Sequence, residues 1–97
     1  MHVDYALPAA SQTPSEVTVT AASAQSAAFA ATTAAVLLCA TQDMRILFGT
    51  NPTALATSTL LPAGVPVPFQ VLKGAAWKVA AIRETADGKL SITEMTE

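Results

Sequence analysis

The residues that could act in catalysis are few in this sequence, and they are spread along it. The chain has one histidine, His2, and one cysteine, Cys39, which follows Leu38 in the most apolar stretch. A general base or a thiolate nucleophile needs partners that hold it and shift its pKa. His2 lies beside the amino terminus, and no cation stands near Cys39 in the sequence. We therefore expect a core-packed thiol and a protein that is not an enzyme.

The acidic residues do not suggest a catalytic or metal-binding set either. The seven carboxylates lie mostly near the termini and in predicted turns, and turn chemistry alone accounts for Asp43 and Asp87. A single cysteine excludes an intrachain disulfide and any metal site built from several thiolates. The four glycines are isolated from one another and make no phosphate-binding loop. The sequence therefore predicts no cofactor and no metal.

Composition indicates a protein that is covered by partners. A chain of 97 residues has room for one domain with a modest core. Charged residues make up 12% of it and hydrophobic residues 52%, and a monomer with so few charges is poorly protected against self-association. The net charge of -2 and the five scattered basic residues argue against nucleic-acid binding. We therefore predict a module that works by binding other protein subunits.

The sequence also argues against a membrane partner. Its most apolar run, residues 27–40, is too short to cross a bilayer, which takes about 20 residues. The first residues show no basic region followed by an apolar block, as a secretory signal would. Synthesis in the cytoplasm is the expectation.

Residues 1–16 are predicted to form an extended arm, and residues 17–97 a β domain. Pro8 and Pro14 stand among small and polar residues in the arm, and proline favours an extended backbone. Besides Val3, the sizeable apolar residues of the arm are Tyr5 and Leu7. The arm is either a disordered tail or a segment that becomes ordered on a neighbouring subunit.

The middle of the chain reads as a series of short strands. Residues 17–20 alternate with the period of a half-buried strand. Residues 21–33 are ambiguous: a turn and a strand around 27–31 are predicted, with a short helix as the alternative. The apolar run 35–40 is predicted to be a strand buried on both faces, paired with residues 44–48 in a hairpin.

The last third of the chain carries an edge strand and a second hairpin. Residues 65–71 alternate, and Pro66 and Pro68 occupy one face; because proline cannot donate a ladder hydrogen bond, this strand must lie at a sheet edge or be bulged. Residues 77–83 and 90–93 flank Asp87-Gly88, a strong hairpin signal that requires positive φ angles. Six to eight short strands with regularly spaced turns predict an all-β fold, a small antiparallel β-sandwich of jelly-roll-like form.

Two further residues have both a structural and a functional interpretation. Trp77, next to Lys78, could form part of a sugar-binding platform, but it is better explained as the main core aromatic residue. Arg45 lies in an otherwise apolar strand. It is either a solvated outward residue or an interface anchor that pairs with an acid of a neighbour.

Several short motifs resemble small proteins encoded in the head-gene regions of tailed bacteriophages. The motifs appear in order from about residue 23 to residue 96: Ser26-Ala27-Ala28 before an apolar strand, Arg45-Ile46-Leu47-Phe48-Gly49-Thr50-Asn51-Pro52-Thr53-Ala54, Leu60-Leu61-Pro62-Ala63-Gly64-Val65-Pro66, and Trp77-Lys78-Val79-Ala80. In such phage proteins a "G-x-N-P-T-A" loop and an "L-L-P-A-G" turn precede a strand that contains W-K-V.

The resemblance implies a non-catalytic virion structural protein, most like a capsid decoration (cement) protein. Such a protein is a β-sandwich, often trimeric, that sits on the capsid surface and clamps neighbouring subunits of the major capsid protein. The implied partners are therefore the major capsid protein and copies of the chain itself. A head-fibre base, a tail component or a receptor- or carbohydrate-binding β-module is the alternative. The candidate interface residues are Tyr5, Leu7, Arg45, Asn51, Pro66 and Pro68.

Overall fold

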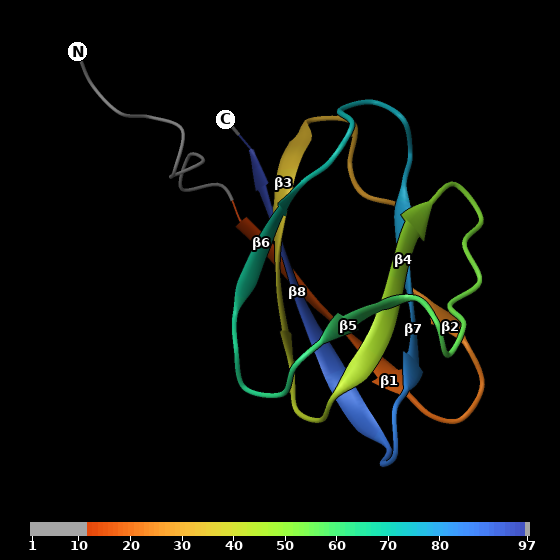
Figure 1. The fold of residues 1–97 in the computed structure, drawn as a ribbon. Coiled ribbons are helices and arrows are strands. Elements are labelled where there is room, and N and C mark those ends of the chain that lie inside the picture. Colours follow the sequence, from red (N-terminus) through yellow and green to blue (C-terminus); the bar gives the residue numbers. More distant parts are fainter. Residues whose placement is uncertain (1–11, 97) are drawn as a thin grey trace.

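The computed structural model describes residues 12–96, which fold into two packed antiparallel β-sheets with no helix among them (Figure 1). One sheet has the strand order β1-β8-β3-β6, and the other has the order β2-β7-β4-β5. The strands are β1 (Gln12–Val19), β2 (Ala24–Gln25), β3 (Thr33–Ala40), β4 (Met44–Gly49), β5 (Thr59–Leu61), β6 (Val67–Gln70), β7 (Lys78–Arg83) and β8 (Gly88–Thr96).

The strand pairing is that of one long hairpin rolled up on itself. β1 pairs with β8, β2 with β7, β3 with β6 and β4 with β5, all antiparallel. Rolling brings β3 against β8 and β4 against β7, which completes the two sheets. Two four-stranded sheets built this way form a jelly roll. The all-β fold class predicted from the sequence is thereby confirmed.

The predicted hairpin between residues 35–40 and 44–48 is wrong, because β3 and β4 lie in different sheets. The turn between them forms hydrogen bonds with distant segments of the chain. The backbone N–H of Thr41 donates to Lys89 O at 3.0 Å, and Asp43 O accepts from the N–H of Glu84 at 3.1 Å. The Asp43 carboxylate also accepts a hydrogen bond from the N–H of Ala63 at 2.8 Å. These long-range bonds direct β3 and β4 to opposite sheets.

The predicted hairpin around Asp87-Gly88 is wrong for the same reason, since β7 and β8 also belong to different sheets. Positive φ angles occur in the described chain at Gly64, Gly74 and Ala76, and not at Gly88. Gly88 instead allows a close approach, because a Cβ atom there would lie 2.7 Å from Thr41 Oγ1.

The amino-terminal boundary and the ambiguous stretch also differ from the prediction. β1 begins at Gln12 and pairs along its whole length with β8, so residues 12–16 of the predicted arm belong to the sheet. Residues 1–11 lie outside the described part of the chain. The strand predicted at 27–31 is wrong: residues 26–30 form an extended connection after the short β2, with Phe29 buried.

The core lies between the two sheets and takes one face of each strand. In β3 the side chains of Val36, Leu38 and Ala40 are buried, whereas Leu37 and Cys39 are half-buried on the outer face. The prediction that this strand is buried on both faces is therefore wrong, and Cys39 is not a core residue. Alternation of this kind is typical of an antiparallel sheet that is packed on one side.

The edge strand is confirmed, because β6 lies at the end of its sheet. Val71 donates its N–H to Ala34 O in β3 at 3.1 Å. The N–H groups of successive residues point alternately to the two sides of an antiparallel strand. The N–H groups of Phe69 and Val67 therefore also point toward β3. Pro66 and Pro68 then occupy the free edge, where they offer no N–H group to an added strand.

Candidate functional site

Exposed leucines gather on the outer face of the sheet β2-β7-β4-β5. Leu47 in β4 is 43% exposed and Leu60 in β5 is 44% exposed. Their strand partners place both on the side opposite the core, with Arg45 directly beside Leu60 and Ile82. Leu55, in the connection from β4 to β5, is 58% exposed. We call Leu47, Leu55 and Leu60 the leucine face.

Arg45 is held on this face by the chain itself. Its Nε and Nη2 donate to the two carboxylate oxygens of Glu84 at 3.2 Å and 3.0 Å, and Nη1 donates to Ser58 O at 3.2 Å. The sequence left Arg45 as a solvated outward residue or as the partner of an acid on a neighbour, whereas the structure pairs it with an acid of the same chain. The two bonds to Glu84 hold the guanidinium in one orientation, as a bidentate arginine–carboxylate contact does.

The ion pair gives a pH-dependent prediction. The hydrogen bond from Arg45, with its charge, lowers the pKa of Glu84, although burial and the nearby Asp43 oppose the shift. A carboxyl group whose pKa is lowered by folding stabilises the fold above its unfolded pKa, and this stabilisation is lost as the pH falls through the folded pKa. Glu84→Gln should therefore be less stable than the wild type at pH 7. The two should converge below the ordinary glutamate pKa of about 4.3.

Denaturant unfolding at a series of pH values measures this difference. Glu16→Gln is the matched control, because it removes one carboxylate whose contact with Lys89 Nζ is longer, at 3.6 Å, and more exposed. If the free energies of unfolding of the wild type and Glu84→Gln still differed by the same amount in strong acid, the prediction would be contradicted.

The connection that carries Asn51 lies over the other half of the same sheet. Asn51 Oδ1 and Pro52 O both accept from the side-chain amide of Gln25 in β2, at 2.9 Å and 2.7 Å. The N–H of Ala54 donates to Ser23 Oγ at 2.9 Å. Asn51 therefore anchors a loop to β2, and its own side chain is exposed at the edge of that loop.

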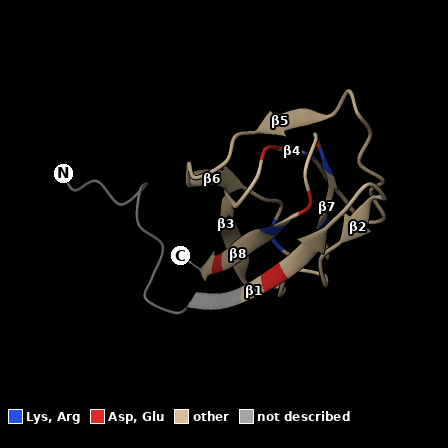
Figure 2. Ribbon diagram, turned by 90° about the horizontal axis from the view of Figure 1, so that it is seen from below, with Lys and Arg blue, Asp and Glu red and all other residues tan. Residues whose placement is uncertain are grey.

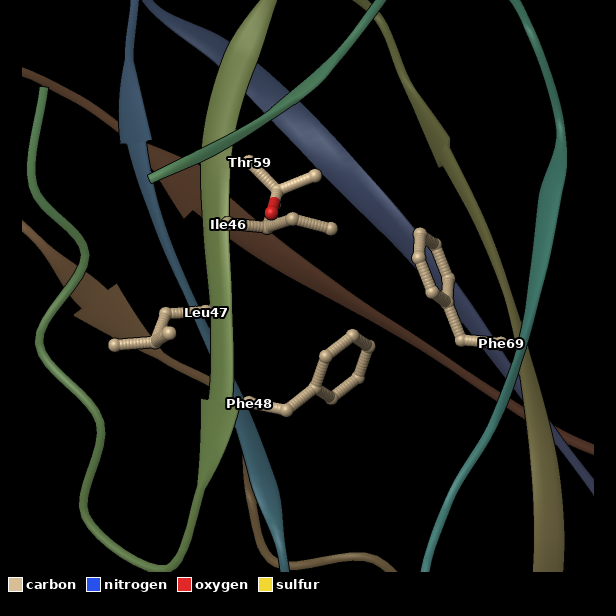
Figure 3. Close-up of a pocket in the computed structure, with 5 residues that line it drawn as sticks. All are labelled: Ile46, Leu47, Phe48, Thr59 and Phe69. Atoms are coloured by element: carbon tan, nitrogen blue, oxygen red, sulfur yellow. The ribbon is translucent and has the colours of Figure 1, made fainter. Parts of the chain in front are cut away.

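An apolar cleft of about 260 Å³ opens between the sheets at the β5–β6 edge (Figure 3). Ile46 and Phe48 of β4 point across it toward Phe69 of β6, and the Phe48 and Phe69 rings lie 5.2 Å apart. Thr59 stands beside Ile46, and Leu47 lies at the rim and points away. Ligand pockets usually measure about 300–1,000 Å³, so this cleft suits a protruding side chain better than a small-molecule ligand.

Trp77 extends the aromatic cluster at the base of this cleft. Its ring centroid lies 6.5 Å from that of Phe48, which in turn lies 6.3 Å from Phe29. Trp77 is half-buried against the core, and Phe29 is the more deeply buried ring. The expectation that Trp77 is the main core aromatic residue is thus only partly met, because four aromatic rings share that position.

The predicted interface residues do not form one cluster. Arg45 lies on the leucine face, Asn51 on the loop beside it, and Pro66 and Pro68 at the free edge of β6. Tyr5 and Leu7 lie outside the described residues.

Sequence reasoning missed the leucine face and the cleft. Leu47 could have been found, because it is the apolar residue at an outward position between the inward Ile46 and Phe48. The cleft could not, since it joins strands whose spatial relation follows from the rolled topology.

Charged residues are confined to some of the strands and connections, as the colours of Figure 2 show. The strands β2, β3, β5 and β6 contain no Lys, Arg, Asp or Glu. Within residues 12–96 no group of three or more His, Cys, Asp or Glu side chains is placed to hold a metal ion. That part of the chain also has no helix of the length and apolarity needed to cross a membrane.

Comparison with known proteins identifies no relative: the chain matches no family model, no curated protein and no solved structure.

Proposed function

We propose that the chain is a non-catalytic structural protein of a phage particle. In this proposal it binds the outer surface of the shell formed by the major capsid protein, at the boundaries between subunits, and stabilises the shell as a decoration protein. Its partners are the capsid subunits and further copies of itself.

The leucine face is the observation that carries the proposal. Single exposed leucines are ordinary on a protein surface, but several on one sheet face indicate an interaction site. The exposed residues Leu47 and Leu60 surround an arginine that is already neutralised by Glu84, so docking would not leave an unpaired charge at the interface. A surface that combines exposed leucines with an internally neutralised arginine fits a protein partner.

The fold and the motifs support different parts of the proposal. Jelly rolls recur in viral capsid proteins, but also in lectins and cupins, and a fold alone does not decide a function. The phage-like motifs favour a virion, and the loop and turn motifs among them contain Asn51, Leu60 and Pro66. The low charge, 12% of residues, suits a subunit whose surface is covered in an assembly.

Counting copies in purified particles tests the role directly. Quantitative mass spectrometry of the phage particles should find the protein at on the order of hundreds of copies, since decoration follows the symmetry of the shell. A count of about six or twelve would instead assign the chain to a tail, connector or fibre ring, the alternative role. Absence from the particles would overturn both.

A charge placed on the leucine face tests the docking surface. Particles made with Leu60→Asp should retain at least roughly tenfold less protein. A second carboxylate beside the Arg45–Glu84 pair leaves a net negative charge against an apolar partner, which costs more than about 1.4 kcal/mol. Thr18→Asp is the matched control, since Thr18 is exposed on the opposite sheet. Equal retention of the two variants, at equal unfolding stability, would exclude the leucine face.

A further inference from the structure

The cleft at the β5–β6 edge leaves inward-pointing aromatic residues partly uncovered. Phe48 and Phe69 point into the space between the sheets, yet both remain only half-buried. The pairing of β5 with β4 ends at Ile46, two residues before Phe48, so the sheet narrows where the cleft opens. Apolar surface of this kind is stabilised when a further apolar side chain covers it.

The amino-terminal sequence offers side chains of the right kind and spacing. Val3, Tyr5 and Leu7 alternate with His2, Asp4 and Ala6. An extended segment places every second residue on the same side, so the three apolar residues can share one surface. Eleven residues precede the first described residue, Gln12, and these three are the large branched or aromatic residues among them.

The same segment of the same chain is poorly placed to fill the cleft. Gln12 lies opposite Met95 in β8, Met95 opposite Ala35 in β3, and Ala35 opposite Gln70 in β6. Three strand spacings of about 4.8 Å separate β1 from β6, a distance of about 14 Å across the sheet. The chain must then still pass around the edge of β6 to enter the cleft.

Leu7 precedes Gln12 by five residues, which span at most about 17 Å when fully extended. Crossing about 14 Å of sheet uses most of this length, so the chain's own Leu7 could enter the cleft only if the segment were almost fully extended. A neighbouring molecule has no such restriction.

We propose that the cleft binds the Val3–Leu7 segment of a second copy of this chain, with Tyr5 packed against the uncovered sides of Phe48 and Phe69. The phenol would pack edge-on against these rings, and its hydroxyl would lie near Thr59, which carries the one side-chain polar group of the lining. The free edge of β6 lacks N–H groups at Pro66 and Pro68. The segment is therefore held mainly by its side chains, and not by a full ladder of backbone hydrogen bonds.

This contact goes beyond the proposed function, because it joins copies of the chain to one another whatever surface they decorate. The purified protein is enough to test it, so its failure is distinct from a failure of the particle count.

Disulfide capture between two variants is the experiment. Both carry Cys39→Ser to remove the native thiol. One adds Ala6→Cys, which keeps Tyr5 in place, and the other adds Thr59→Cys and a tag that gives the mixed dimer its own mass. Mixed under mild oxidation, they should form the mixed dimer in several-fold excess over a control mixture of Ala6→Cys with Ser91→Cys. Ser91 is exposed on the outer face of β8, away from the cleft.

Each outcome decides the proposal. A mixed dimer in excess of the control supports it. If the mixed dimer is no more abundant than in the control, the cleft is not the binding site. A third variant carries both added cysteines in one chain. If it forms an internal disulfide while no mixed dimer appears, the segment binds the cleft of its own chain and the proposal is overturned. As a second measurement, Tyr5→Ala should reduce the mass in light scattering toward one chain, whereas Ser11→Ala should not. A wild-type protein that remains a single chain at all concentrations also overturns the proposal.

Discussion

Replacing Leu38 by alanine is expected to lower the free energy of unfolding by about 3 kcal/mol, a large part of the total for a domain of this size. Leu38 is fully buried, and its strand partners on either side are Ile92 in β8 and Val67 in β6. Removing its side chain leaves a cavity between two sheets that cannot close around it, because the ladders hold the strands apart.

Leu37→Ala is the matched control, since it makes the same chemical change one residue earlier. Leu37 lies on the outer face of β3 and is half-buried, so the loss should be less than half as large. Guanidinium unfolding curves of the two variants give the comparison. Equal losses would mean that β3 is covered on both faces in the folded protein, as its unbroken apolar sequence suggested.

Gly88→Ala is expected to lower the free energy of unfolding by about 2 kcal/mol, although the φ angle of this glycine is not positive. The new Cβ would lie 2.7 Å from Thr41 Oγ1 and 3.0 Å from Gln42 Cβ. The threonine hydroxyl cannot move away freely, because it accepts a hydrogen bond from the N–H of Lys89 at 2.8 Å. The substitution must therefore push β8 away from the β3–β4 turn.

Two further variants identify this contact as the cause. Gly49→Ala should be nearly neutral, because its Cβ would lie 3.8 Å from Pro52 Cβ, an ordinary contact. Thr41→Ala, added to Gly88→Ala, should cost less than the sum of the two single changes, since it removes the atom in closest contact. Thermal unfolding of the wild type, Thr41→Ala, Gly88→Ala and the double variant measures this coupling. Strictly additive losses would place the effect of Gly88→Ala elsewhere.

The two proposed contacts adjoin at Leu47, which belongs to the leucine face and lies at the rim of the cleft. The leucine face lies on the outside of one sheet, and the cleft lies between the sheets at the β5–β6 edge. One copy could therefore bind a shell through its leucine face while its cleft accepts the amino-terminal segment of a neighbour. Joined in this way, the copies would dissociate from the shell more slowly than single copies, because each is held at more than one contact.

The sequence by itself determined the features that depend on near neighbours in the chain. Alternation marked the strands from Val17 onward, and two prolines marked β6 as an edge strand before any partner was known. The number of short strands and the regular spacing of the turns between them were enough to predict a small β-sandwich. These signals survive folding because side-chain alternation and the missing proline N–H are local properties of the backbone.

The tertiary structure alone decided which strands pair. The turns at Thr41–Asp43 and around Asp87 resemble hairpin turns, yet backbone hydrogen bonds join the two turns to each other, from Thr41 to Lys89 O and from Glu84 to Asp43 O. Strand pairing in a rolled hairpin is non-local, and a short polar turn fits either a hairpin or a crossing between sheets.

The same non-local pairing explains why Cys39 lies outside the core and why Arg45 forms an ion pair with Glu84. It also explains why Phe48 contacts Phe69 in an open cleft. The prediction of a binding protein began from the small number and wide spacing of possible catalytic residues, which the sequence shows directly. The surfaces now proposed for binding became visible only when the two sheets closed.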